Sequence, residues 1–227
     1  MFVAASDPLV ELWVQQMNAD VRSLQPYYAE GKSRAESYGQ MVDAMLEAVR
    51  EGRRVCGAFY GHPGVFACVP HRAIEQARNE GFDATMEAAV SAEDCLYADL
   101  GIDPGTYGCQ HYEASQFMMY RRRIDPTAFL VLWQVGVAGD RTLARPGTGA
   151  AHRRILLDIL SRDYPDDHVV TLYEAATLPM TTPRSEQVRL RHLADADLRG
   201  QTTVVIPPSR PMELNPDVVR RLAQLEA

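Results

Sequence analysis

Four common sequence patterns are missing from this chain of 227 residues, and their absence argues against three classes of protein. The cysteines Cys56, Cys68, Cys95 and Cys109 include no CxxC pair, and the six histidines form no HExxH pair, which argues against a metal site. No apolar run approaches the ~18 residues that a membrane span needs. Residues 1–6 lack the charged region of a signal peptide, so we expect reduced thiols, cytoplasmic localisation and no membrane partner.

Positive charge is also scarce. The formal net charge is −7, which argues against a broad surface for nucleic acid. The local basic stretch Arg121-Arg122-Arg123 is typical of a solvated loop face. Apolar residues make up 46% of the chain and charged residues 23%, as in a soluble globular protein. The length fits one large domain or two small lobes.

Hydrophobic spacing predicts alternating helices and strands. The clearest helix covers 33–52, because apolar residues recur there every three and four positions, Ser33 and Glu36 resemble a capping box, and Gly52 is a natural stop. Alternation of this kind predicts the α/β class, with a mostly parallel sheet in the N-terminal lobe. The expected helices cover 8–17, 33–52, 70–80, 91–100, 115–123, 152–163, 185–193 and 216–225, and the expected strands cover 55–60, 83–86, 110–113, 129–135, 168–173 and 202–206.

A boundary between two lobes is expected near residues 136–149, which are rich in glycine and include a proline. We therefore expect an N-terminal α/β lobe over 1–137 and a C-terminal α/β lobe over 138–227. Ligand sites commonly lie in the cleft between two such lobes. Trp13 and Met17 share one face of the first helix, which indicates either core packing or a dimer interface.

The turn Gly61-His62-Pro63-Gly64 follows the apolar strand 55–60. Ligands of open α/β sheets bind just beyond the carboxyl ends of strands, and glycine lets the backbone approach a ligand closely. Upstream, Arg34 and Tyr38 lie four residues apart, so one helix face carries both side chains. Spacing alone leaves two interpretations open: a converging catalytic pair, or a core tyrosine beside a surface arginine.

Three longer motifs follow one another along the chain: Phe59-Tyr60-Gly61-His62-Pro63-Gly64-Val65-Phe66, then 90–100, which begins Val90-Ser91-Ala92-Glu93-Asp94, and Leu132-Trp133-Gln134-Val135-Gly136. Shorter stretches also carry the resemblance, around Tyr28, 31–34, Tyr38, 101–104, 112–115, Thr202 and 206–208. Through these residues and the three motifs, the chain resembles the tetrapyrrole methylase superfamily of class III methyltransferases. Within that superfamily it is most similar to the borosin peptide backbone α-N-methyltransferases. The resemblance implies a two-lobed tetrapyrrole-methylase-like fold that uses S-adenosyl-L-methionine to methylate backbone amides of a ribosomal precursor peptide.

The resemblance also implies roles for individual residues. Tyr28, Arg34, Tyr38 and Tyr60 line the reacting centre, where Tyr38 is expected to act as base or proton relay, acidified by Arg34, with water as an alternative proton carrier. The implied cofactor-binding residues are Tyr60, His62, Val65, Phe66, Ser91, Ala92, Gln134, Ala176 and Thr202. Simpler roles stay open: Ser91 as a helix N-cap, Gln134 as an ordinary strand exit, and His62 as a backbone contact.

Two features depart from the family pattern. The family begins with a strand and a glycine-rich turn before the equivalent of Phe2, so the first strand of the fold is expected to be missing here. Ala88-Ala89 replaces the Pro-Gly that usually precedes Val90, which narrows the expected cofactor slot. No apolar core peptide follows residue 208, so we expect the split type of enzyme, which methylates a separate precursor peptide in trans. Homodimers are the rule in this family, so we expect one.

Two alternative functions remain open at this point. The chain could methylate a small molecule such as a tetrapyrrole, although such an enzyme would lack the set of Tyr28, Arg34 and Tyr38. It could also be a non-catalytic subunit for peptide binding or dimerisation. In the peptide-binding interpretations, Arg121-Arg122-Arg123 is an alternative contact for an acidic precursor peptide.

Overall fold

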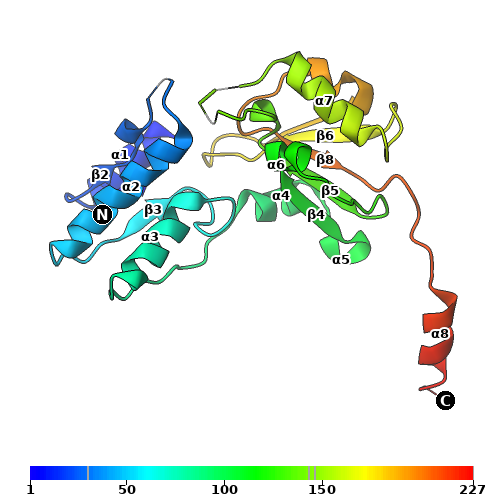
Figure 1. Ribbon diagram of the computed structural model, residues 1–227, viewed down its shortest axis with the longest axis horizontal. Coiled ribbons are helices and arrows are strands. Elements are labelled where there is room, and N and C mark those ends of the chain that lie inside the picture. The colour runs from blue at the N-terminus through cyan, green and yellow to red at the C-terminus, as the bar shows by residue number, and fades with distance from the viewer. Residues whose placement is uncertain (30, 143, 146, 227) are drawn as a thin grey trace.

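A small parallel sheet organises the first lobe (Figure 1). The computed structural model describes residues 1–29, 31–142, 144–145 and 147–226. Strand β1 (Phe2–Ala4) lies between β2 (Arg22–Ser23) and β3 (Gly57–Phe59), and it pairs in parallel with both. The mostly parallel sheet predicted for the N-terminal lobe is therefore confirmed.

Helix α2 (Arg34–Arg50) supplies the apolar face that covers this sheet. Its N-terminus is capped by Ser33, whose hydroxyl accepts a hydrogen bond from the Ala35 N–H at 3.2 Å. Met41 and Leu46 are 1% exposed and form a core with Phe2 of β1. The other elements of this lobe are α1 (Pro8–Met17), the 3₁₀ turn η1 (Gln25–Tyr27) and α3 (Cys68–Asn79).

The second lobe is a five-stranded mixed sheet in the order β4-β5-β8-β6-β7. β4 and β5 are parallel, whereas β8 pairs antiparallel with β5 and β6, and β7 pairs antiparallel with β6. Leu130, Leu132, Leu172 and Val204 are fully buried in its core. The strands are β4 (Cys109–Glu113), β5 (Phe129–Trp133), β6 (Val169–Glu174), β7 (Arg184–Arg189) and β8 (Thr203–Ile206).

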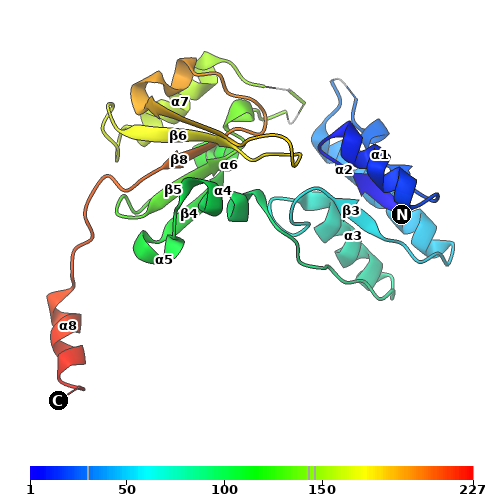
Figure 2. The same cartoon turned by 180° about the vertical axis from the view of Figure 1, so that it is seen from behind.

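Several short helices surround this sheet: α4 (Ala92–Leu100), α5 (Pro104–Tyr107), α6 (Ala114–Met119), η2 (Val135–Val137), α7 (Ala150–Leu160) and η3 (Leu190–Asp195). Helix α8 (Pro216–Ala223) lies apart from both lobes at the end of an extended segment (Figures 1 and 2). Asp103 and Pro104 start α5 inside a segment expected to be a loop, with the same Asp-Pro signal that starts α1.

The sheet pairing groups the chain differently from lobes over 1–137 and 138–227. β4 and β5 precede residue 138, yet β5 pairs with β8, which follows it. The two sheets are instead separated in sequence by the stretch between α3 and α4, which appears in Figure 1 as the extended connection between the lobes.

Two predicted elements are wrong. Residues 185–193 were expected to be a helix, but β7 occupies 184–189 because each of its residues pairs with β6, from Glu174↔Arg184 to Val169↔Arg189. Residues 83–86 were expected to be a strand, but they belong to neither sheet. The Ala84 carbonyl accepts hydrogen bonds from the Arg78 guanidinium instead, at 2.6 and 2.9 Å.

The first helix exposes its apolar residues. Leu9, Leu12, Trp13 and Met17 are each between 55% and 61% exposed. Core packing of Trp13 and Met17 within one chain, one of the two expected alternatives, is therefore wrong. In the part of the chain that the structure describes, no helix is both long and apolar enough to cross a membrane.

Candidate active site

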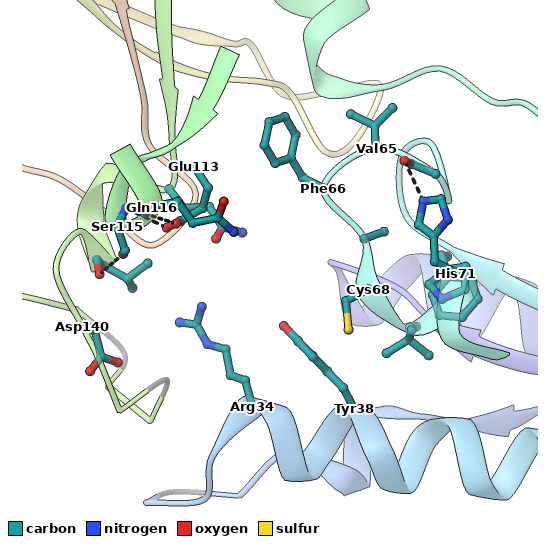
Figure 3. A pocket seen from close by; sticks show the side chains of 18 of the residues that line it. Arg34, Tyr38, Val65, Phe66, Cys68, His71, Glu113, Ser115, Gln116 and Asp140 are labelled. Carbon is teal, nitrogen blue, oxygen red and sulfur yellow. Dashed lines mark hydrogen bonds between the residues drawn. The ribbon is translucent and has the colours of Figure 1, made fainter. Parts of the chain in front are cut away.

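A cavity of about 1050 Å³ is lined by residues from both lobes. Figure 3 shows Arg34 and Tyr38 projecting from α2 into this space, with Glu113, Ser115 and Asp140 of the second lobe across from them. The residues expected at the reacting centre all line it: Tyr28, Arg34, Tyr38 and Tyr60. The structure thus brings together four side chains that come from three separate segments of the first lobe.

Local structure explains how these four side chains meet. Arg34 is the first residue of α2 and Tyr38 lies one turn later, so both side chains occupy one face. Tyr28 follows η1, and its ring lies 6.3 Å from the ring of Tyr38, nearly perpendicular at 86°. Tyr60 directly follows β3, and its N–H donates to the Ala4 carbonyl at 3.1 Å.

The electrostatics of the tyrosines differ from expectation. Burial raises the pKa of Tyr38, and the nearby Arg34 cation lowers it by less, so the net direction is upward. Burial and the neighbouring Tyr38 and Tyr60 likewise raise the pKa of Tyr28 above its ordinary value. The expectation that Arg34 acidifies Tyr38 is right for the contribution of Arg34 but wrong for the net shift. Both phenols are therefore protonated hydrogen-bond donors near neutral pH.

The loop after β3 approaches the cavity closely. His62 Nδ1 accepts a hydrogen bond from the Gly64 N–H at 2.9 Å, and His71 Nε2 lies 3.0 Å from the Gly64 carbonyl. A Cβ on Gly64 would lie 2.9 Å from Met86 Sδ, so this position has no room for a larger residue. Phe66 then takes a positive φ of 49°, which is unusual for a non-glycine residue.

Gln134 of the second lobe shares the positive φ of Phe66. It follows β5 with a φ of 58°, and the next N–H, of Val135, donates to the Thr202 carbonyl at 2.9 Å. Among the described residues, Phe66 and Gln134 alone combine a side chain with a positive φ, and both line the cavity. Backbone strain of this kind concentrates at functional sites.

Two carboxylates of the cavity are held by backbone donors of their own segments. Glu113 caps α6, accepting from the N–H groups of Ser115 at 3.0 Å and Gln116 at 2.7 Å. Asp140 accepts from the Thr142 N–H at 2.9 Å and the Arg145 N–H at 3.0 Å. Burial raises the pKa of Asp140, but the hydrogen bond from the Thr142 hydroxyl, at 2.7 Å, and the backbone donors together outweigh burial and hold this pKa below its ordinary value. Both side chains are hydrogen-bond acceptors that shape the second-lobe wall.

The expected cofactor residues divide into two groups. Tyr60, Val65, Phe66 and Gln134 line the cavity. Ser91 forms a capping box with Asp94, and the Thr202 hydroxyl donates to Glu174 at 2.7 Å, so both have structural partners. The members of the expected set that lie outside the cavity lining are His62, Ser91, Ala92, Ala176 and Thr202.

Sequence reasoning missed several residues of the cavity. Glu113 and Ser115 lie inside a motif that carried the family resemblance, so their position was a usable signal. Asp140 lies within the glycine-rich stretch 136–149 and gave no such signal. Arg121 and Arg122 line the cavity, although the basic stretch was expected first as a solvated loop face, with contact to an acidic precursor peptide as the alternative. Within the described ranges, no group of three histidine, cysteine, aspartate or glutamate side chains is placed to hold a metal ion.

The chain belongs to the family of tetrapyrrole (corrin/porphyrin) methylases, whose sequence profile matches residues 2–194. Its fold is that of solved methyltransferases. It resembles a cobalt precorrin-4 methyltransferase of cobalamin biosynthesis, with a TM-score of 0.60 at 16% identity over 91% of this chain and 83% of that one. It also resembles a uroporphyrin-III C-methyltransferase from Thermus thermophilus in complex with S-adenosylhomocysteine, with a TM-score of 0.59 at 15% identity over 91% and 84%.

More similar sequences come from fungi. The chain is 40% identical to the methyltransferase/ribosomally synthesised cyclic peptide dendrothelin A precursor of Dendrothele bispora, over 100% of this chain and 55% of that protein. It is 41% identical to a methyltransferase/type I borosin cyclic peptide precursor of Coprinopsis marcescibilis, over 96% and 58%. A type III borosin precursor of Anomoporia bombycina is 36% identical over 100% and 27%. The chain thus spans about half the length, or less, of these relatives.

Proposed function

We propose that this chain transfers methyl groups from S-adenosyl-L-methionine to backbone amide nitrogens of a ribosomal precursor peptide that it binds as a separate chain. One observation carries the proposal: Tyr28, Arg34, Tyr38 and Tyr60 line a single cavity between the lobes. The names of relatives at 36–41% identity, each a methyltransferase joined to a peptide precursor, support the same substrate class.

The cavity suits the cofactor in size and lining. Its volume of about 1050 Å³ exceeds the ~300–1000 Å³ of typical small-molecule pockets, which leaves room for a peptide beside a nucleoside. Val65 and Phe66 offer apolar surface, and Tyr60 and Gln134 offer a hydroxyl and an amide, so these four residues would hold the cofactor. When bound, S-adenosylmethionine supplies an electrophilic methyl group.

The protein's own task is to make an amide nitrogen react. Its lone pair is delocalised into the carbonyl, so the nitrogen is a poor nucleophile. Tyr28 and Tyr38 are protonated donors near neutral pH, which suits them to stabilise negative charge that grows on the carbonyl oxygen. Arg34 places a cation on the same wall and supports that charge. Alignment of the nitrogen against the methyl carbon supplies the rest of the acceleration.

The amide proton must leave as the nitrogen–carbon bond forms and the sulfur–carbon bond breaks. Tyr38 is the proposed acceptor, directly or through water, once its hydroxyl has lost its own proton to solvent. Burial opposes that loss and Arg34 favours it. The base role therefore strengthens as pH rises.

The first experiment is a calorimetric titration of this chain with S-adenosylhomocysteine. We expect saturable binding of one ligand per chain. Incubation with S-adenosylmethionine and separate valine- and isoleucine-rich peptides should then add one methylene mass per methylation, located on backbone nitrogen by fragment-ion mass spectrometry. A parallel incubation with uroporphyrinogen tests methylation of a tetrapyrrole, the substrate class in the family's name.

Each outcome decides among the functions. Methylation of uroporphyrinogen but of no peptide would replace the proposal with small-molecule methylation. Binding of peptide without binding of S-adenosylhomocysteine would make the chain a non-catalytic subunit. Methylated peptide in the added, separate chain would establish action in trans.

We further propose that the enzyme is a cytoplasmic homodimer. The exposed stripe of Leu9, Leu12, Trp13 and Met17 on α1 is the apolar surface that supports a second copy. The four cysteines are free thiols, which fits a reducing compartment. Light scattering of the protein and of Trp13→Glu tests the dimer: the variant should shift towards monomer, and a monomeric parent protein would contradict the proposal.

A further inference from the structure

Three arginines line the cavity without an ion pair. The described residues form ten salt bridges, counting those of histidine, and none of them includes Arg34, Arg121 or Arg122. Arg34 donates a single long hydrogen bond, of 3.4 Å, to the Arg145 carbonyl. A chain with a net charge of −7 thus places free positive charge where its ligands bind.

The acidic residues of the cavity do not pair with these arginines. Both oxygens of Glu113 accept from the first N–H groups of α6, and both oxygens of Asp140 accept from the loop that follows it. These carboxylates are used in fixing local backbone. The guanidinium groups of Arg121 and Arg122 are therefore available to an anion from outside the chain.

Aromatic contacts hold Arg122 in place. Its guanidinium carbon lies 5.2 Å from the ring centre of Tyr112 and 5.7 Å from that of Tyr120. A cation held between two rings loses less conformational freedom when it binds a carboxylate. Beside it, Met119 and Tyr120 are 52% and 62% exposed and also line the cavity, so apolar surface adjoins the cation.

We propose that Arg121 and Arg122 form a carboxylate subsite for the peptide substrate. The subsite binds an acidic side chain, or the C-terminal carboxylate, a few residues from the apolar position whose amide nitrogen meets Tyr38. Guanidinium groups match the two oxygens of a carboxylate, which favours this anion over an uncharged partner. The inference rests on the proposed function and specifies its substrate: an apolar peptide with a nearby negative charge.

The test uses a panel of fluorescein-labelled, valine- and isoleucine-rich peptides. Each carries one glutamate or one glutamine, moved along the chain, and each is made with a free or an amidated C-terminus. Affinity is measured by fluorescence anisotropy in the presence of S-adenosylhomocysteine, and KM and kcat by mass spectrometry. The proteins are the parent chain, the double variant Arg121→Gln/Arg122→Gln, and Arg123→Gln as a matched control, because Arg123 does not line the cavity.

We expect one glutamate register, or the free C-terminus, to bind about 10-fold more tightly than its uncharged counterpart, as for a partly exposed charge-assisted hydrogen bond. The double variant should lose this preference while keeping kcat and its affinity for S-adenosylhomocysteine. Arg123→Gln should keep the preference. Comparison of the glutamate peptides with the peptides that have a free C-terminus shows whether the bound carboxylate comes from a side chain or from the end of the peptide.

Other outcomes overturn the inference. Peptides that bind and are methylated equally well with glutamate, glutamine or an amidated end would remove the carboxylate subsite and leave the proposed function intact. Equal loss in Arg123→Gln would reduce the effect to general surface charge. Loss of S-adenosylhomocysteine affinity in the double variant would assign these arginines to the cofactor. Failure of every peptide to bind would remove both proposals.

Discussion

The two walls of the cavity hold their polar groups in different ways. On the second-lobe wall, Glu113 and Asp140 are fixed by backbone N–H donors, and the Ser115 hydroxyl accepts from the Gly139 N–H at 3.1 Å. On the first-lobe wall, Arg34 has one 3.4 Å contact, and Tyr28 and Tyr60 are 44% and 65% exposed. The carboxylates and the serine of the second-lobe wall are satisfied by the protein, whereas the first-lobe side chains, together with Arg121 and Arg122, present groups to a ligand.

Packing follows the same division. Most residues of the main second-lobe core have no exposed surface, with Leu198 at 8% as the largest exception, whereas every residue of the first-lobe core except Leu24 keeps a few per cent. A less completely buried lobe opens locally at lower free energy. The comparison indicates that the second lobe is the rigid reference against which the first lobe positions its tyrosines and arginine.

Removing the Tyr38 hydroxyl tests the first wall directly, and we expect the largest effect there. Tyr38→Phe should lower the rate of methyl transfer at least ~100-fold, because proton transfer and oxyanion stabilisation each contribute on that scale. Affinity for S-adenosylhomocysteine should stay near that of the parent, as measured by calorimetry. Tyr107→Phe, outside the cavity lining, is the matched control and should leave turnover unchanged. Parent-like turnover in Tyr38→Phe would remove this residue from the mechanism.

One glycine-to-alanine substitution in each lobe compares how well the two lobes tolerate an added methyl group. A Cβ on Gly136 would lie 1.9 Å from the Arg199 carbonyl oxygen, and one on Gly57 would lie 2.7 Å from the Phe59 ring and 2.8 Å from the Met45 methyl group. Backbone cannot move aside as side chains can, so Gly136→Ala should lower the free energy of unfolding by about 1–3 kcal/mol, and Gly57→Ala by less than about 1 kcal/mol. Urea unfolding measures both.

Gly149→Ala is the control for this comparison, because no atom lies within 4 Å of the added Cβ. It should be nearly neutral. A larger loss for Gly57→Ala than for Gly136→Ala would reverse the assignment of the rigid lobe.

The influence of Arg34 on Tyr38 is expected in the pH dependence of the rate. If deprotonated Tyr38 accepts the amide proton, activity rises with pH through the alkaline range, because burial raises the Tyr38 pKa. Arg34 lowers that pKa, so Arg34→Gln should move the alkaline rise to higher pH and reduce the rate near neutrality. Initial rates across pH measure this shift. A rate that is flat or falls with pH would make Tyr38 a hydrogen-bond donor only.

The smallest expected effect concerns His111 of β4, which lies behind the cavity. Trp133 Nε1–H donates to His111 Nδ1 at 3.1 Å, and His111 Nε2 lies 2.8 Å from the Tyr97 hydroxyl. Burial lowers the His111 pKa, and Glu93 raises it by less. The unfolded chain therefore binds this proton more readily, so folding stability decreases as pH falls below about 6.5.

His111→Gln should reduce that acid sensitivity, because glutamine offers an acceptor and a donor but does not titrate in this range. The melting temperatures of parent and variant at about pH 7.5 and pH 5.5 measure it. His192→Gln, on an exposed residue, is the control. The Trp133 ring centre also lies 5.5 Å from that of Phe66, so Trp133 fluorescence reports whether protonation of His111 changes the packing at the cavity wall.

Local sequence signals succeeded where a segment makes its own contacts. Helix α2 forms where its Ser33 cap and its apolar spacing predict it. Local sequence signals failed where pairing with another segment of the chain decides the conformation. Residues 185–193 were expected to be a helix, yet Val188 pairs with Val170 of β6 and becomes a strand residue. Residues 83–86 have β propensity but no strand beside them.

The same distinction applies to the cavity. Sequence motifs were enough to select Tyr28, Arg34, Tyr38 and Tyr60, and the four do line one space. The pKa shift of Tyr38 could not be predicted from residue spacing, because burial depends on atoms from both lobes and here outweighs the Arg34 cation. Nor could the place of Arg121 and Arg122, because they follow α6 and line the cavity together with residues of the first lobe, far from them in sequence.

The sequence by itself determined the α/β class, the order of most elements and the family, because short-range caps, hydrophobic periods and contiguous motifs carry that information. Tertiary structure alone decided which strands share a sheet, which arginines line the cavity and in which direction the pKa values of Tyr28 and Tyr38 shift. These properties depend on contacts between residues far apart in the chain, and on the exclusion of water that such contacts produce.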